Sequence, residues 1–261
     1  TAVTAYFDGL DLLVSNVGDS RVMLGSVDAQ GKLIHKALST DQTPYRRDER
    51  ERVKACGARV MTADQIDGVE PIHEVRGPVS FRDVPSRRRR TATPSTRPLE
   101  WFVTTQDWDC ALGDEIDDGG DPPRIWAQDQ EYPGTAFTRS IGDSLAESLG
   151  VMAEPELDHH QIKANDKVLI VASDGIFEFI TTRGCLDMAL LYNNPLEACL
   201  ALVGESYKLW IEREDRTDDI TIIVGFIEQS GAKRDPGVGV DEVAIEEGET
   251  AAMKKKKTRR G

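Results

Sequence analysis

Three carboxylates stand at the ends of apolar segments that are far apart in the chain. Asp174 comes just after the apolar run 168–172, which reads as a strand buried on both faces. Asp19 lies in a Gly-Asp turn between two predicted strands, and Asp218 just precedes a further apolar run. A carboxylate held rigidly at the end of a buried strand is costly as an unpaired charge, so the position suits a metal ion. Carboxylates that converge repel one another unless a cation lies among them.

The residue types of these positions indicate which cation would bind. A set of oxygen ligands without Cys or His suits Mg²⁺ or Mn²⁺ rather than zinc. The competing interpretation is that Asp174-Gly175 is an ordinary turn with no chemistry, since Asp-Gly is common turn punctuation. Only the repetition of the pattern at Asp19 and Asp218 favours the metal site.

The composition restricts the possible functions. The chain has 261 residues, 39% of them hydrophobic, and its 32 basic and 46 acidic side chains give a formal net charge of −14. An acidic surface argues against nucleic-acid binding. There is no apolar run long enough for a membrane span and no visible signal peptide. The four Cys show no CxxC spacing and read as reduced, mostly buried thiols, which predicts a cytoplasmic or nuclear protein.

The first third of the chain predicts short strands and then a helix. Segments 3–7, 12–17, 22–26 and 33–38 read as an antiparallel meander. Thr43 and Pro44 are typical of a helix N-cap and first helical position, and Gly57 of a C-cap. The predicted helix between them is mostly charged, so we expect it on the surface.

Two helices are predicted after Asp174, at 181–191 and from Asn194-Pro195 to about Glu214. Apolar residues of the second helix recur at three- and four-residue spacing and predict one apolar stripe. These residues are Leu196, Leu200, Val203, Tyr207 and Trp210. Packing of this stripe onto a sheet is the favoured interpretation, and a partner-binding groove is the alternative.

Two segments are predicted to be disordered. Residues 84–98 are basic, Pro-rich and nearly free of apolar side chains, and residues 230–261 are Gly-rich and acidic with a basic end. We therefore predict one domain over 1–229 with an insertion near 84–98, followed by a charged tail. The chain opens on an apparent strand without an initiating Met, so we expect it to be the C-terminal part of a longer protein.

Four motifs resemble those of the metal-dependent serine/threonine phosphatases of the protein phosphatase 2C type. They occur in the family's order and spacing, and the loop sequences are most similar to those of plant or protist members. The motifs are Asn16-Val17-Gly18-Asp19-Ser20-Arg21, residues 133–143, Ala172-Ser173-Asp174-Gly175 and Asp218-Asp219-Ile220-Thr221. The resemblance covers most of 1–228. It implies an α+β fold in which two stacked antiparallel sheets are flanked by helices.

The resemblance also implies roles for the carboxylates. Asp174 and Asp218 match ligands of a pair of Mg²⁺ or Mn²⁺ ions, and Asp19 matches a ligand of a further, weaker site whose partner position is Glu178. Asp219 stands where Asn is usual and Gln42 where His is common, and we expect the Gln42 difference to be neutral. Arg139 and Asp143 are expected to support their loop rather than to contact substrate.

The family also carries an upstream Asp-Gly-His-Gly-Gly type motif and a phosphate-gripping Arg, and neither is found in these residues. We therefore expect no identifiable catalytic side chain here, and a chain that by itself is an impaired enzyme. The leading hypothesis is hydrolysis of phosphoserine and phosphothreonine in phosphoprotein substrates by a monomer. The alternatives are a catalytically silent regulatory or binding module of the same fold and, less favoured because of the acidic charge, a divalent-metal nuclease.

Overall fold

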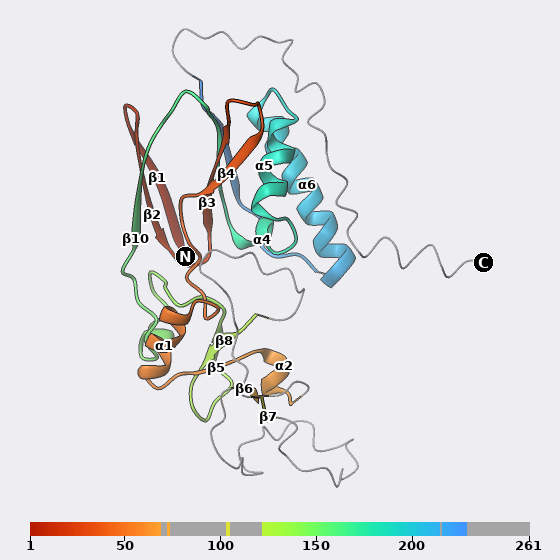
Figure 1. Ribbon diagram of the computed structural model, residues 1–261. Helices are drawn as coiled ribbons and strands as arrows, with labels where there is room; N and C mark the ends of the chain where they lie inside the picture. Colours follow the sequence, from red (N-terminus) through yellow and green to blue (C-terminus); the bar gives the residue numbers. More distant parts are fainter. Residues whose placement is uncertain (69–71, 74–102, 105–121, 215, 229–261) are drawn as a thin grey trace, which may run out of the picture.

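The computed structural model describes residues 1–68, 72–73, 103–104, 122–214 and 216–228, and it contains two stacked antiparallel sheets (Figure 1). The first sheet has the order β1-β2-β10 and the second β12-β11-β3-β4. The first sheet consists of β1 (Ala2–Asp8), β2 (Asp11–Val17) and β10 (Glu156–Gln161). The second consists of β3 (Arg21–Val27), β4 (Leu33–Ala37), β11 (Asp166–Ala172) and β12 (Ile222–Phe226). This arrangement confirms the predicted α+β class of antiparallel sheets flanked by helices.

The central strands of the second sheet, β3 and β11, are covered on both faces, as the apolar run of β11 predicts. Alternate residues of a strand point to opposite faces. Thus Leu169 packs with the residues between the two sheets, whereas Val168 and Ile170 pack with the helices on the other side. In β3, Leu24 faces the first sheet and Met23 faces the helices. Strand β11 therefore has no solvent-facing side, and the chain that follows it starts from a fixed position.

The predicted meander of four consecutive strands is wrong at its centre. β1 pairs with β2 and β3 pairs with β4, but β2 and β3 belong to different sheets. The chain crosses between the sheets at Gly18, which has φ +113°. Both strands bury their inward-facing apolar side chains in the space between the sheets. The alternating sequence pattern of each strand is therefore explained without hydrogen bonds between β2 and β3. Asp19 lies in this crossing rather than in a hairpin turn.

Three helices cover the outer face of the second sheet (Figure 1). They are α4 (Asp174–Phe177), α5 (Thr182–Leu190) and α6 (Pro195–Glu214). The two helices predicted from the sequence correspond to α5 and α6, and Thr181 caps α5 by accepting a hydrogen bond from the backbone N–H of Gly184.

The buried face of α6 is not the predicted stripe. Leu196, Leu200 and Tyr207 are 63%, 64% and 55% exposed. Trp210 is the member of the predicted stripe that is buried, together with a row that sequence reasoning did not select: Ala198, Leu202 and Ser206. Both rows have helical spacing, and the small side chains of Ala198 and Ser206 permit a close approach of the helix to its neighbours. The prediction that Leu196 and Leu200 pack onto the sheet is therefore wrong.

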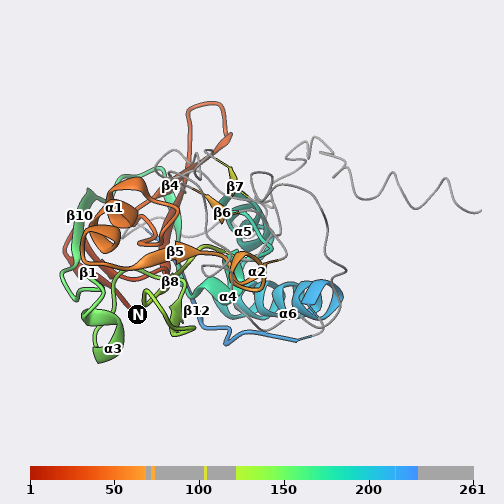
Figure 2. The same ribbon diagram turned by 90° about the horizontal axis from the view of Figure 1, so that it is seen from below.

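A smaller region lies below the sandwich (Figures 1 and 2). It contains a third antiparallel sheet of order β5-β8-β9 and a two-residue parallel pair, β6 and β7. Its strands are β5 (Arg59–Met61), β6 (Ile72–His73), β7 (Val103–Thr104), β8 (Arg124–Trp126) and β9 (Pro133–Thr135). Its helices are α1 (Arg47–Ala55), α2 (Ala63–Ile66) and α3 (Ser144–Glu147).

Helix α1 differs from its prediction at its start and in its burial. It begins after Arg46, not at Thr43-Pro44, and Glu49, Arg50 and Val53 are buried. Glu49 is buried in ion pairs with Arg52 and Arg139, and Arg50 is buried while it donates to the Pro44 and Tyr45 carbonyls. A mostly charged sequence therefore did not mean a helix that lies wholly on the surface. The positive φ of Gly57, +91°, agrees with the predicted helix end.

The predicted insertion at 84–98 and the predicted tail at 230–261 lie outside the described residues, and the domain boundaries stay predictions. In the part of the chain that the structure describes, no helix combines the length and apolarity needed to cross a bilayer.

Candidate metal centre

The Asp19 turn is tightly constrained by its own backbone. Gly18 has φ +113°, and an added Cβ atom would lie 2.2 Å from Cγ2 of Thr1. The Gly18 carbonyl accepts hydrogen bonds from the Gln42 backbone N–H at 3.0 Å and from Nδ2 of Asn16 at 3.1 Å. Asp19 follows with only 9% of its surface exposed. A side chain other than that of glycine at position 18 would move the turn that carries the carboxylate.

The Asp174 turn is held from the helical side. Oδ1 of Asp174 accepts a hydrogen bond from the Gly175 backbone N–H at 2.9 Å. The Gly175 carbonyl accepts from Oγ of Ser206 at 2.6 Å and from Nε1 of Trp210 at 2.7 Å, both on the buried face of α6. Helix α6 therefore positions the residue next to Asp174. The buried face of α6 both packs against the core and supplies, from Ser206 and Trp210, the two hydrogen bonds to the Gly175 carbonyl.

The Asp218 segment is joined to the same turn by backbone contacts. The Ser173 N–H donates to the Thr221 carbonyl at 3.0 Å, and Oγ of Ser173 donates to the Asp219 carbonyl at 3.0 Å. The Asp219 oxygen lies so close to Gly175 that an added Cβ atom would be 2.5 Å from it. Glycine at 175 is required for this approach, and the approach brings Asp218 beside Asp174.

The carboxylates of this region destabilise one another's charged forms. Burial and then the negative charge of Asp174 raise the pKa of Asp19 to about 7. Burial and then the charge of Asp218 raise the pKa of Asp174, and desolvation with the charge of Asp174 raises that of Glu178. Asp174 thus interacts electrostatically with both Asp19 and Asp218, in a region rich in negative charge.

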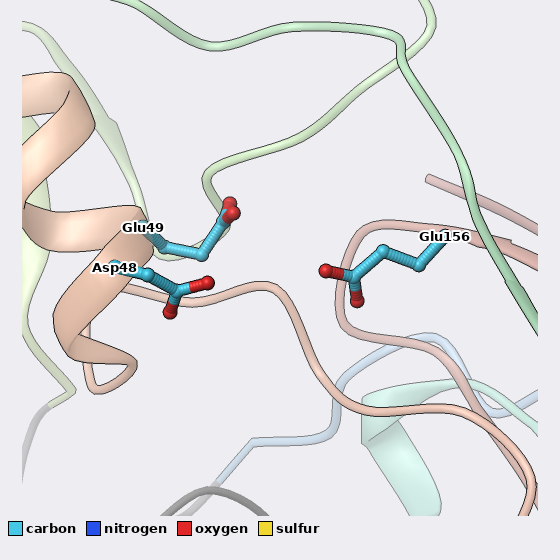
Figure 3. Close-up of side chains that lie close together, drawn as sticks. All are labelled: Asp48, Glu49 and Glu156. Carbon is cyan, nitrogen blue, oxygen red and sulfur yellow. The ribbon is translucent and has the colours of Figure 1, made fainter.

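A second acidic group, Asp48, Glu49 and Glu156, has the opposite electrostatics (Figure 3). In the part of the chain that the structure describes, this is the only set of three metal-type ligands whose oxygens all lie within 4.8 Å of one another. Arginines, however, already occupy it. Arg46 contacts Asp48 and Glu156 at 2.7 Å each, and Arg139 contacts Glu49 at 2.7 Å.

The arginines account for the pKa values of that group. Burial opposes the charge of Glu49, but hydrogen bonds from Arg52, Arg139 and Thr138 outweigh it and lower the pKa of Glu49 to about 2. The pKa values of Asp48 and Glu156 are lowered as well, in each case mainly by the hydrogen bond from Arg46. A divalent cation would have to displace these guanidinium groups, so we interpret this group as a structural ion-pair network. Arg139 supports the loop, as expected from the sequence.

The Asp19–Asp174–Asp218 cluster is the better fit to a hard divalent ion. Its ligand atoms are oxygens, burial and then neighbouring negative charge raise the pKa values of Asp19 and Asp174, and a cation would offset that charge. Ligands of separate ions need not all lie within 4.8 Å of one another, and Asp174 is the residue that interacts electrostatically with both Asp19 and Asp218. The residues present therefore fit Mg²⁺ or Mn²⁺, and their assignment as ligands remains a prediction.

Sequence reasoning missed Asp41 beside the cluster, and it expected Gln42 to be a neutral replacement rather than a residue bound to the Asp19 turn. Asp41 adds negative charge at Asp19 and Asp174, and it pairs with Nη2 of Arg21 at 2.7 Å. Gln42 is fully buried and binds the backbone of the Asp19 turn. The Asp-Gln dipeptide follows a strand with no apolar pattern of its own, so only the three-dimensional contacts reveal it.

The family model and the most similar relatives all belong to one protein family. The family model for "Protein phosphatase 2C" matches residues 1–76 and 119–208. "Probable protein phosphatase 2C 35" of Arabidopsis thaliana is 44% identical over 224 residues, which cover 86% of this chain and 54% of the relative. "Probable protein phosphatase 2C 64" of Oryza sativa subsp. japonica is 26% identical, and the match covers 96% of this chain and 47% of the relative. The chain thus spans about half the length of the curated relatives it matches.

Solved structures show the same fold. A serine-threonine phosphatase 2C from Toxoplasma gondii superposes with a TM-score of 0.57 at 16% identity, covering 87% of this chain and 57% of that chain. A C. elegans sex determining protein superposes with a TM-score of 0.51 at 16% identity, covering 87% of this chain and 40% of that chain. At this identity the likeness extends to the fold alone.

Proposed function

This chain belongs to the protein phosphatase 2C family, and from that premise we propose that it forms part of a metal-dependent protein serine/threonine phosphatase. The observation that carries the proposal is the cluster around Asp174, in which burial and then neighbouring negative charge raise the pKa values of Asp19 and Asp174. Ionised carboxylates in this position cost free energy that a bound cation would offset.

The residues have distinct tasks in this proposal. Asp174 and Asp218 would hold a pair of divalent ions, and Asp19 with Glu178 would hold a further, weaker one. Ions bound there would supply a water of lowered pKa and would offset the charge that develops on phosphoryl oxygens. The tasks of the protein are then to fix the ligand positions and to keep the carboxylates ionised.

Contacts among the described elements support the first of these proposed tasks. Strand β11 is buried on both faces, α6 holds the Gly175 carbonyl through two hydrogen bonds, and the Asp219 backbone packs against Gly175. These contacts leave little freedom to the main chain at Asp174 and Asp218. Rigid placement of ligands is what distinguishes a catalytic metal site from a loose surface cluster.

Phosphoserine and phosphothreonine in proteins are the proposed substrates, and the proposed location is the cytoplasm or nucleus, with the protein acting as a monomer. The second candidate is a catalytically silent module of the same fold. The 261 residues contain no Asp-Gly-His-Gly-Gly motif. Because that motif would add a ligand shared by both ions, we propose that these residues alone hold metal weakly and turn over slowly.

A phosphatase assay separates the two candidates. Release of phosphate from a phosphothreonine peptide by the full-length protein should depend on added Mn²⁺, should stop when a chelator is added and should be lost in Asp174→Asn. Asp187→Asn is the matched control, because Asp187 lies on α5 in an exposed pair with Arg183. Wild-type turnover in Asp174→Asn would show that the site is elsewhere, and absence of turnover in the wild type would favour the silent module.

A further inference from the structure

Gln42 makes three hydrogen bonds to the turn that precedes Asp19, although the residue is 0% exposed. Its Oε1 accepts from the Gly18 N–H at 2.6 Å, and its Nε2 donates to the Asn16 carbonyl at 3.1 Å. Its backbone N–H donates to the Gly18 carbonyl at 3.0 Å. Both polar backbone groups of Gly18 are therefore bound by one residue, immediately before Asp19.

The residue is itself held in place from two directions. The neighbouring Asp41 is bound by Nε of Arg21 at 3.1 Å and by its Nη2 at 2.7 Å, so segment 41–42 contacts the turn on both sides of Asp19. The Gln42 carbonyl accepts from the Thr138 N–H at 2.7 Å, and the Thr138 hydroxyl donates to the buried Glu49. The ion-pair network of α1 is thus connected to the Asp19 turn through Gln42.

We propose that Gln42 is a positioning residue whose carboxamide fixes the Asn16–Gly18 turn, and thereby the direction of the Asp19 carboxylate, and so sets the divalent-ion affinity of the cluster. The inference rests on the proposed metal-dependent function and adds a residue to it. A glutamine suits this position because one planar group presents an acceptor to the Gly18 N–H and a donor to the Asn16 carbonyl at the same time. An apolar side chain of equal length would leave both groups buried and unpaired.

The test compares Mn²⁺ binding by the full-length wild-type protein and its Gln42→Met variant, measured by titration calorimetry at a temperature where circular dichroism shows both to be folded. We expect the affinity of Gln42→Met to fall about fivefold or more, since the loss of two hydrogen bonds to the turn is not compensated. Gln65→Met is the matched control. Gln65 is 1% exposed, and its Oε1 accepts from the Thr62 N–H at 3.0 Å in the capping box of α2.

A purely structural role would predict a different outcome: both methionine variants would lose stability, and both would bind Mn²⁺ like the wild type. That result would overturn the inference and leave the metal centre intact. If neither the wild type nor Gln65→Met binds Mn²⁺, the proposed metal-dependent function fails, and this inference fails with it.

A second measurement needs no variant. When Mg²⁺ is added to the wild-type protein, the carboxamide NMR signals of Gln42 and the amide signal of Gly18 should shift with one shared midpoint. The carboxamide signals of Gln65 should stay constant. Signals of Gln42 that remain unchanged while Mg²⁺ binds would overturn the inference.

Discussion

The carbonyl oxygen of Asp219 lies where a Cβ atom on Gly175 would be only 2.5 Å away. Main-chain oxygen cannot yield as a flexible side chain can, so a methyl group at this position must push the 218–220 segment away from Asp174. The distance between two predicted metal ligands thus depends on a glycine that carries no functional group.

Gly175→Ala should therefore weaken Mn²⁺ binding while leaving the sandwich folded, with a loss of stability of about 1–3 kcal/mol from overpacking. Gly204→Ala is the matched control, because Gly204 lies in α6 with no atom within 4 Å of an added Cβ. That variant should raise the free energy of unfolding by up to about 1 kcal/mol, since alanine is the better helix former. Calorimetric titration with Mn²⁺ and thermal unfolding check both, and equal Mn²⁺ affinity in the two variants would contradict the account.

Asp19→Asn should stabilise the protein when no metal is present. Burial and repulsion by Asp174 raise the pKa of Asp19 to about 7, so ionising this carboxyl in the folded state costs free energy. We expect a gain on the order of 1–2 kcal/mol in chelator at neutral pH. The same variant should lose part of the stabilisation that Mn²⁺ gives to the wild type. A destabilised Asp19→Asn protein in chelator would show that Asp19 is compensated by a partner already in the fold.

The lowered pKa of Glu49 makes the free energy of unfolding depend on pH in the acid range. Its folded pKa of about 2 is below its ordinary value of 4.5, so the folded state favours the ionised form. Its contribution is fully present above pH 4.5 and is lost as the pH falls toward 2, and the shift corresponds to about 3 kcal/mol. At neutral pH, Glu49→Gln should cost about 3–5 kcal/mol, because buried Arg139 loses its nearer carboxylate and keeps the more distant Glu156, at 3.1 Å.

The measurement is urea unfolding of wild type and Glu49→Gln between pH 7 and pH 3, in which the difference between the two should shrink as the pH falls. Glu51→Gln is the control, since Glu51 forms an exposed pair with Arg47, with side chains 63% and 81% exposed. Its effect should stay within about 0.5 kcal/mol at all pH values. A pH-independent penalty in Glu49→Gln would mean that Glu49 acts through packing rather than charge.

Two leucines of α6 should respond very differently to truncation. Leu202 is 0% exposed and belongs to the core between α6 and the second sheet, whereas Leu200 is 64% exposed. Leu202→Ala should cost about 2–5 kcal/mol, and Leu200→Ala less than about 0.5 kcal/mol. Chemical denaturation of the two variants gives both values, and a large loss in Leu200→Ala would show that its stripe is covered in the folded protein.

The sequence predicted the parts of the fold that depend on alternation and on turn residues. The apolar run before Asp174 could only be a strand covered on both faces, and the glycines at 18 and 57 occupy the positive-φ positions that their turns need. The prediction from sequence failed where two different sets of residues on one helix have the same spacing. Two rows of α6 have helical spacing, and the small side chains Ala198 and Ser206, not hydrophobicity, decided which row is buried.

The carboxylates of the candidate site were predicted from the sequence, but the residues that hold their main chain in place were not. Carboxylates at strand ends are visible in a sequence, and so are the motifs that contain them. Gln42, Ser206 and Trp210 act by hydrogen bonds to main-chain atoms at Gly18 and Gly175. Such contacts join residues distant in the chain and leave no spacing rule, so they could be found only in three dimensions.

Mn²⁺ binding to the wild-type protein and to Asp174→Asn, measured side by side by titration calorimetry, tests the metal centre most directly. The account predicts saturable binding by the wild type and by the Asp187→Asn control, and a loss of at least about tenfold in affinity in Asp174→Asn, because a central ligand carboxylate becomes a neutral amide. Equal affinity in the wild type and Asp174→Asn would contradict it.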